Sequence, residues 1–286
     1  MLFLRISLLV LLHQLHLSQS YKPVVFMHGV FSSGEKAKHI FQWINESHPG
    51  TDTFTVNMYD DQKSLTNLNK QVTKIGAWMV ELMKKYKDGI NLICFSQGGQ
   101  VCRGIIERMD HNVHTFISLS APQGGQFGLT LALTKLFPKW VRDNIYEVLY
   151  TEVGQKFSVG NIWNDPRHQD RYKEFSEYLA VINNDIKHNR SQEYKTNFAK
   201  LKKLVLIGGP DDGVIAPWQS SQFGVFDEKL NVHNMSETSW FKDDLFGLRT
   251  LYSRGNVVTC TFPGVHHTFW HSTKPVFDKC ILPYLT

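Results

Sequence analysis

The stretch from residue 90 to residue 99 constrains the fold of this chain more than any other. It reads INLICFSQGG. The run from Ile90 to Cys94 is apolar and rich in β-branched residues, which predicts one buried strand. Ser96 follows, and beyond two glycines a helical pattern begins at Val101. Strand, sharp turn with a serine at its tip, then helix is the local structure that a nucleophilic serine requires.

The turn departs from the usual G-x-S-x-G pattern at one position. Gly98 lies two residues after the serine, but Cys94 stands where the first glycine is usual. Cysteine is small, so the turn is still expected to form. Taken alone, the stretch fits an ordinary strand-to-helix turn as well as a catalytic one.

The first twenty residues are unlike the rest of the chain. Arg5 lies near the start of an apolar run, and the segment ends in the small residues Ser18 and Ser20. This pattern predicts a secretory signal peptide over residues 1–20. The alternative, a membrane anchor, fits less well because the run is too short to span a bilayer and polar residues interrupt it. No later apolar stretch reaches about 18 residues, so we expect no transmembrane segment.

The remaining residues, 21–286, are expected to form one domain. The hydrophobic share of 42% and the aromatic share of 13% are typical of globular proteins. The net charge of +5 comes without long runs of lysine or arginine, so nucleic acid is not an expected partner. No Cys/His cluster has the spacing of metal ligands, so we expect no metal and no cofactor. A monomer is expected.

Four cysteines in a secreted chain suggest two disulfides, for which three pairings exist. We favour Cys94–Cys102, which would brace the turn around Ser96, together with Cys260–Cys280. The alternative is four free thiols.

Three N-glycosylation sequons agree with the secretory route, although such sequons are common by chance. They begin at Asn45, Asn189 and Asn234.

Strand-like and helix-like segments alternate along the first 120 residues. The long amphipathic pattern over 65–86 predicts a helix between two strands. This alternation predicts an α/β fold with a parallel or mostly parallel sheet. The predicted strands cover residues 23–27, 53–58, 90–94, 114–119, 204–207 and 256–261.

The alternation stops between about residues 123 and 202. This segment is rich in aromatic residues, and a featureless loop of that length is unusual in a compact domain. We therefore predict a mostly helical cap, inserted over the carboxyl edge of the sheet and lining an apolar pocket. The alternative is that the aromatic side chains form the cap's own core, and this is expected to hold for most of them.

Two further predicted strands end in loops that carry an acid and a histidine. Asp212 lies in the loop GGPDDG, and His267 follows the last strand. The chain order Ser96, Asp212, His267 is that of α/β hydrolases. All three residues fall at carboxyl ends of strands, where open α/β sheets bind their ligands. The sequence therefore predicts an α/β-hydrolase fold with a Ser-His-Asp triad.

Each residue type has a chemical role in this arrangement. His267 would take the proton of Ser96, because a serine hydroxyl is a weak nucleophile on its own. Asp212 would fix the tautomer of the imidazole and stabilise its cation. Two backbone N–H groups would stabilise the tetrahedral oxyanion, that of Gln97 and that of Val30.

Other residues compete for these roles. Asp211 is the rival acid, and His266 is the main rival base. His28 is expected to shape its loop rather than to act as a base. Asp60 and Asp61 also follow a strand, but they precede the serine in the chain and are expected to be solvated.

These residues resemble a known family, the lysosomal palmitoyl-protein thioesterases, and they are closer to the branch of the second thioesterase than to that of the first. The resemblance covers essentially the whole chain after residue 20. Its most specific pieces are LICFSQGGQVCRGII around Ser96 and LIGGPDDGVIAPWQSS from Leu206. Further matches are HGVFSS from His28, INESHPGT around Asn45, FISLSAPQGGQFG from Phe116 and HHTFWHS from His266.

The resemblance implies a soluble, glycosylated lysosomal enzyme that hydrolyses fatty acyl thioesters, either acyl-CoA or S-acylated cysteine. The family's nucleophile, acid and base fall on Ser96, Asp212 and His267. Both proposed cysteine pairs match family disulfides, and the cysteine at position 94 is shared. Two other functions remain open from the sequence: an oxygen-ester lipase or acyltransferase with the same triad, and a non-catalytic lipid-binding protein.

Overall fold

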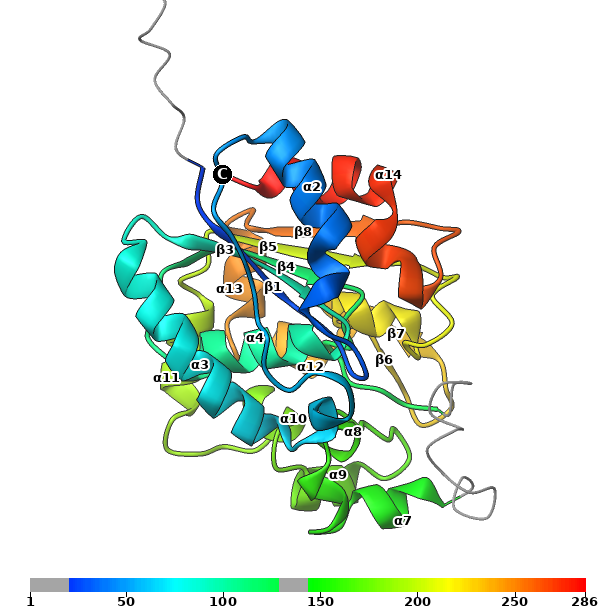
Figure 1. Ribbon diagram of the computed structural model, residues 1–286. Coiled ribbons are helices and arrows are strands. Elements are labelled where there is room, and N and C mark those ends of the chain that lie inside the picture. The colour runs from blue at the N-terminus through cyan, green and yellow to red at the C-terminus, as the bar shows by residue number, and fades with distance from the viewer. Residues whose placement is uncertain (1–20, 129–143) are drawn as a thin grey trace, which may run out of the picture.

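The computed structural model of the protein describes residues 21–128 and 144–286 (Figure 1). The predicted signal peptide lies outside the described residues. The centre is a six-stranded sheet in the order β2-β1-β3-β4-β5-β8, and every neighbouring pair is parallel, which confirms the predicted parallel sheet. Its strands are β1 (Val24–Met27), β2 (Thr53–Thr55), β3 (Ile90–Phe95), β4 (Val113–Leu119), β5 (Lys203–Gly208) and β8 (Val257–Thr261).

The central strands are apolar on both faces because both faces of the sheet are covered. All six residues of β3 are buried. Side chains alternate along each strand, so Leu92 joins one apolar core and Ile93 joins the other. A run without polar alternation, as read from the sequence, is what such a doubly covered strand requires.

Helices cover the two faces (Figure 1). Below the sheet in that view lie α3 (Leu68–Lys85) and α4 (Gln97–Arg108), whose apolar stripes contribute Val72, Ile75 and Ile105 to the first core. Above it lie α2 (Lys38–Ser47) and the C-terminal α14 (Lys274–Val276), which continues as a π-helical turn over Phe277–Ile281. Each face thus has its own core, and the carboxyl ends of the strands are left free for loops.

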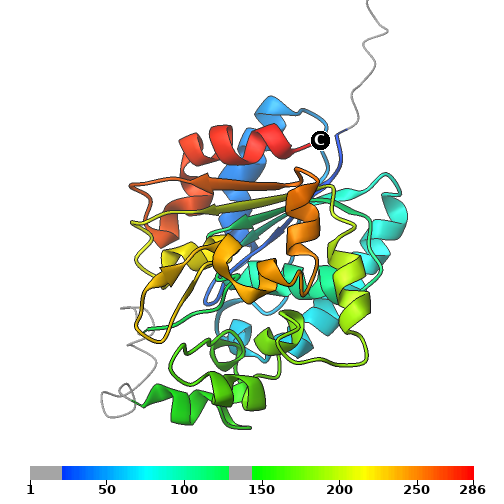
Figure 2. The same cartoon turned by 180° about the vertical axis from the view of Figure 1, so that it is seen from behind.

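In the described part of the segment between β4 and β5, the short helices over residues 145–182 gather at one end of the molecule, away from α2 and α14 (Figure 2). Most of the described aromatic side chains of this segment are buried, among them Tyr150, Trp163, Tyr172 and Tyr178. Phe157 is 51% exposed. The helices are α7 (Ile145–Leu149), α8 (Ser158–Asn161), α9 (Gln169–Phe175), α10 (Leu179–Ile182) and α11 (Ser191–Phe198).

Between β5 and β8 the structure holds elements that the sequence reading did not assign. A small antiparallel hairpin pairs β6 (Val225–Phe226) with β7 (Val232–His233), and α12 (Ser239–Lys242) and α13 (Leu248–Ser253) follow. Strands of two residues and helices of four to six are too short to show a hydrophobic period.

Two disulfides join Cys94 to Cys102 and Cys260 to Cys280. The first ties β3 to α4 beneath the serine turn. In the described ranges, the longest apolar helical stretches fall short of what crossing a membrane requires.

Candidate active site

Ser96 lies at the tip of the turn between β3 and α4, with the strained backbone angles φ 55° and ψ −132°. Neighbouring glycines make this geometry possible. A Cβ at Gly29 would lie 2.7 Å from the Cβ of Ser96, and a Cβ at Gly98 would collide with the carbonyl oxygen of His28. Strain of this kind is concentrated at functional sites. Cys94, in place of a glycine, is accommodated because its side chain is turned into the disulfide with Cys102.

Three side chains from distant parts of the chain meet at this turn. His267 Nε2 lies 2.9 Å from Ser96 Oγ. On the other side of the ring, Nδ1 lies 2.9 Å from Asp212 Oδ2 and 3.1 Å from Oδ1. The main chains are also joined, because the N–H of His267 donates to the carbonyl oxygen of Asp212 at 2.9 Å. Each residue is less than 10% exposed: Ser96 6%, Asp212 2% and His267 8%.

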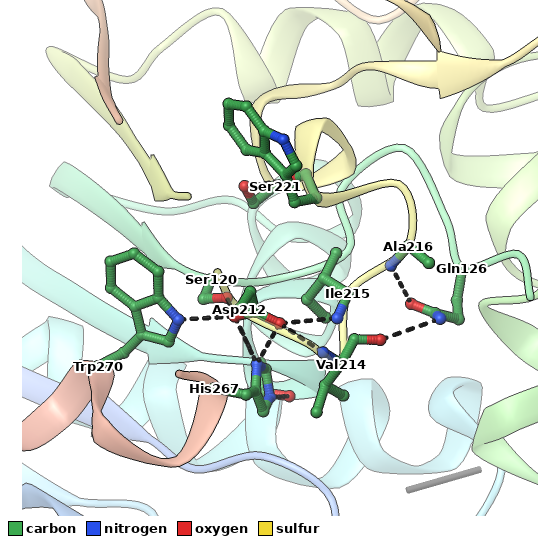
Figure 3. Close-up of polar contacts among 11 residues, drawn as sticks. Ser120, Gln126, Asp212, Val214, Ile215, Ala216, Ser221, His267 and Trp270 are labelled. Atoms are coloured by element: carbon green, nitrogen blue, oxygen red, sulfur yellow. Dashed lines mark hydrogen bonds and ion pairs between the residues drawn. The ribbon is translucent and has the colours of Figure 1, made fainter. Parts of the chain in front are cut away.

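The carboxylate of Asp212 accepts hydrogen bonds from several sides (Figure 3). Backbone N–H groups of Val214 and Ile215 donate to Oδ1 at 3.0 and 2.7 Å. Ser120 Oγ and Trp270 Nε1 both donate to Oδ2 at 2.6 Å. Burial opposes ionisation of this group, but His267, followed by the N–H of Ile215 and the hydroxyl of Ser120, outweighs burial and lowers the pKa of Asp212 to about 2.

Sequence reasoning missed Ser120 and Trp270. Both had a weak signal. Ser120 directly follows β4, at the same carboxyl edge of the sheet as Ser96. Trp270 lies three residues after His267 in one 3₁₀-helical segment, so the two rings can approach one carboxylate together.

The rival residues lie elsewhere. Asp211 is exposed and accepts the N–H of Gly264 at 2.7 Å, and His266 is exposed. His28 is buried, with ring nitrogens 2.9 and 3.2 Å from the carbonyl oxygens of Gly29 and Met58. His271 is buried edge-on against Phe95, and burial, followed by the charge of Lys36, lowers its pKa to about 4.

The predicted oxyanion donors are the backbone N–H groups of Gln97 and Val30. Gln97 begins α4, and Val30 follows the glycine whose backbone touches Ser96. Within the described part of the chain, neither backbone N–H donates a hydrogen bond to a protein acceptor.

Two hollows share Leu65 and Phe157, and one of them is lined by Phe31, which follows Val30 in the chain. The first, called here the apolar pocket, has a volume of about 250 Å³ and is lined by Leu65, Val148, Leu149, Val153, Gly154, Phe157 and Val159. The second, called here the entrance groove, has a volume of about 500 Å³ and is lined by Phe31, Gln62, Leu65, Thr66, Lys156 and Phe157.

No group of three or more potential metal-ligating side chains occurs within residues 21–128 and 144–286.

Residues 23–267 match the family model described as palmitoyl protein thioesterase. The chain is 47% identical to rat lysosomal thioesterase PPT2 over 93% of its own length and 89% of the relative's. It is 46% identical to human lysosomal thioesterase PPT2 with the same coverage. Against the Drosophila melanogaster lysosomal thioesterase PPT2 homolog, identity is 41% over 99% of both chains. Among solved structures, a lipase-esterase related protein from Clostridium acetobutylicum matches with a TM-score of 0.48 and 12% identity, covering 94% of this chain and 96% of that one.

Proposed function

Because the chain belongs to the palmitoyl protein thioesterase family, we propose that it hydrolyses fatty acyl thioesters in the lysosome through an acyl-enzyme formed on Ser96. The assignment of the residues rests on two contacts of 2.9 Å each, from Ser96 Oγ to His267 and from His267 to Asp212. A hydroxyl, an imidazole and a carboxylate in this order form an activated nucleophile.

Acylation begins when His267 Nε2 takes the proton of Ser96 Oγ. The new Oγ–C bond gives a tetrahedral oxyanion, which the N–H groups of Val30 and Gln97 stabilise. The C–S bond then breaks, the sulfur leaves with its electron pair, and the proton on His267 passes to the leaving thiolate or to solvent, so that the imidazole is neutral again. A thiol has a pKa of about 8.5, so it leaves far more readily than an amine and needs less help from the protonated imidazole.

Deacylation repeats the sequence with water. His267 takes a proton from the water, the hydroxide adds to the acyl carbon, and the C–Oγ bond breaks as the proton returns to Ser96. Asp212 stays ionised throughout and stabilises the imidazolium in both halves.

We place the acyl chain in the apolar pocket, reached through the entrance groove beside Val30. The pocket is lined almost entirely by aliphatic and aromatic side chains, as an apolar ligand requires. Of the seven large hydrophobic side chains that the described residues expose, four line the pocket or the groove: Phe31, Val148, Val153 and Phe157.

The three sequon asparagines, Asn45, Asn189 and Asn234, are all exposed, which supports the proposal that they carry glycans. Every group of the proposed triad comes from one chain, so catalysis needs no second subunit, and we propose a monomeric enzyme. Light scattering of the secreted protein, before and after enzymatic deglycosylation, tests both proposals.

The experiment is hydrolysis of palmitoyl-CoA by Ser96→Ala, with Ser253→Ala as the matched control, since Ser253 is exposed at the end of α13. Ser96→Ala is expected to lose turnover by at least about 10³-fold with an unchanged thermal midpoint, because no other group can form the acyl-enzyme. The control should keep wild-type activity.

If Ser96→Ala retained turnover, the assignment of Ser96 as the nucleophile would be wrong. Faster cleavage of a matched oxygen ester than of the thioester would instead favour a lipase. Failure of the wild-type protein to react with a fluorophosphonate would point to a lipid-binding protein without catalysis.

A further inference from the structure

Oxygen Oδ2 of Asp212 contacts more donors than its role as partner of His267 requires. It accepts from Ser120 Oγ and Trp270 Nε1, both at 2.6 Å, as well as from His267 Nδ1 at 2.9 Å. Ser120 Oγ also lies 3.5 Å from Nδ1. Both donors are neutral groups, and both residues are 1% exposed. Figure 3 shows Trp270 and His267 approaching the carboxylate from different sides.

The backbone around Ser120 is held in a costly conformation. Its φ is 44°, in the left-handed region that residues with a side chain seldom adopt. The position follows β4 directly, and its N–H donates to the carbonyl oxygen of Ile207 in β5 at 2.8 Å. Such strain persists where the surrounding structure imposes it. Here the strained turn aims a hydroxyl at the carboxylate.

Trp270 reaches the same atom from the element that carries His267. The 3₁₀ segment His267–Ser272 places the indole in the second apolar core, against the sheet, with its N–H directed at Oδ2. An indole nitrogen can only donate, so it favours an acceptor that is fully available. An ionised carboxylate is such an acceptor, whereas a protonated one has given up part of its capacity.

We propose that Ser120 and Trp270 are positioning residues which keep Asp212 ionised and fixed in one orientation under acidic conditions, so that His267 retains the tautomer that faces Ser96. This inference rests on the proposed function, and it describes how the carboxylate of Asp212 stays charged in an acidic compartment. Both residues act through Asp212, because a carboxyl group that became protonated could no longer accept the Nδ1–H and stabilise the imidazolium.

Few other titratable groups surround this carboxylate. His267 is in contact with it, and the charge of His267 in turn acts on His271 in the same 3₁₀ segment. Asp211, its neighbour in the chain, accepts the Gly264 N–H instead. When His267 is neutral, the negative charge of Asp212 is therefore stabilised mainly by uncharged hydrogen-bond donors.

The test compares Trp270→Phe and Ser120→Ala with two matched controls. Trp240 is also a buried tryptophan whose Nε1 donates to a carboxylate oxygen, that of Asp185 at 2.7 Å, outside the triad. Ser221 is a buried serine that donates to the carbonyl oxygen of Trp218 at 2.7 Å. The controls Trp240→Phe and Ser221→Ala remove the same atoms from comparable environments.

The measurement is kcat and KM for palmitoyl-CoA from pH 4 to pH 8, per active site titrated with a fluorophosphonate. Removing one donor leaves Asp212 largely ionised at pH 4.5, so kcat is expected to fall about two- to threefold near pH 4, where protonation of the carboxyl begins. The loss should shrink toward pH 7, KM should change little, and the acid limb should move to higher pH. Ser120→Cys, which keeps a weak donor on an unbranched side chain, should restore part of the activity.

A loss that is constant across pH, or equal in the controls, would overturn the proposal, since a general packing defect lowers activity at every pH alike. If Trp270→Phe does not fold, replacing Trp270 by benzothienylalanine keeps the ring shape and removes only the N–H, and wild-type activity of that protein also overturns it. The fluorophosphonate titration separates this outcome from failure of the proposed function, because an enzyme with a working Ser96 is labelled in either case.

Discussion

Asp211 and Asp212 are neighbours in the chain, yet their surroundings give them different chemistry. Asp211 is exposed and receives one backbone N–H, whereas Asp212 is 2% exposed and receives donors on both oxygens. Burial alone would raise the pKa of Asp212, so the pKa of about 2 reflects its partners. At pH 4.5 such a group is almost fully ionised, which an acid partner of a catalytic imidazole requires.

The pair offers a prediction with a built-in control. Asp212→Asn should lower kcat by about 10³- to 10⁴-fold, because an amide cannot stabilise the imidazolium and favours the wrong tautomer. Asp211→Asn should stay within about threefold of the wild type. Steady-state kinetics at pH 7 on both proteins checks this, and comparable losses in the two would contradict the assignment of the acid.

The pH dependence of stability gives a second readout of the same group. Its folded pKa lies below the ordinary value of 3.8, so its contribution to stability is fully present above that value and is lost as the pH falls toward 2. Asp212→Asn should therefore flatten the acid side of the unfolding profile between pH 4 and pH 2.

At this scale the sequence could predict the residues of the triad but not their support. Ser96, Asp212 and His267 each follow a strand that a run of apolar residues predicts. Their order along the chain indicates the topology of an α/β hydrolase. Ser120 and Trp270 touch Asp212 from 92 and 58 residues away in the chain, and their places after β4 and after His267 are only a weak indication of those contacts.

At the scale of an element, α4 carries a fully buried ion pair behind the serine turn. Arg103 Nε donates to Glu107 Oε1 at 2.7 Å, and neither side chain is exposed. The guanidinium has other partners, since it lies 4.1 Å from the ring centroid of Phe246 and donates to the carbonyl oxygens of Gln123 and Ile182 at 3.2 Å. It thereby links α4 to the segment between β4 and β5.

Burial raises the pKa of Glu107 to about 7, against the opposing effect of Arg103. A folded pKa above the unfolded value of 4.5 means that this group contributes stability below pH 4.5 and loses that contribution as the pH rises through 7. The difference is of order 3 kcal/mol if it acts alone. The carboxyl of Glu107 thus favours the folded state more in acid than at neutral pH.

We predict that Glu107→Gln reduces the difference between the thermal midpoints at pH 5 and pH 7 by several degrees, because the amide does not titrate. Its oxygen can still accept from Arg103 Nε. Glu193→Gln, in the exposed pair with Arg190 on α11, is the control and should leave the difference unchanged. Calorimetry at the two pH values decides the matter, and an unaltered difference in Glu107→Gln would refute the role of this carboxyl.

Elements could be predicted from the sequence where they are long or bury both faces. The strands β3 and β4 and the helix α3 have six, seven and 18 residues, enough for a hydrophobic pattern to be read. The described helices between β4 and β5 have four to eight residues, so a sequence pattern predicts no more than an overall helical character for that segment. The hairpin of β6 and β7 has strands of two residues, and in its loop the side chain of Asp227 accepts the backbone N–H groups of Lys229 and Asn231.

At the scale of the whole molecule, the proposed acid and the segment between β4 and β5 are connected. Gln126 donates to the carbonyl oxygen of Val214 and accepts the N–H of Ala216, both at 3.2 Å, in the loop that carries Asp212 (Figure 3). Its own backbone exchanges hydrogen bonds with Ile162 and Asn164. The loop of the acid is therefore fixed by the same segment that lines the apolar pocket.

Under the proposed function, this arrangement separates the reaction from the recognition of chain length. The proposed triad is built on the sheet, whereas Val148, Val153 and Phe157 at the pocket come from the segment between β4 and β5. A change at the mouth of the pocket should therefore affect long acyl chains without affecting the chemistry on short ones. Val153, which is 62% exposed, is suited to such a change because its replacement costs the fold little.

We predict that Val153→Asp lowers kcat/KM for palmitoyl-CoA about tenfold and leaves butyryl-CoA nearly unchanged. A carboxylate at the mouth removes apolar contact that is worth about 0.8 kcal/mol for each buried methylene, and a tenfold loss corresponds to about 1.4 kcal/mol. Leu230→Asp is the matched control, since Leu230 is 38% exposed between β6 and β7 and does not line the pocket. A rate series over even chain lengths from four to sixteen carbons tests the idea. An equal loss at all lengths, or a loss in the control as well, would show that the acyl chain lies elsewhere.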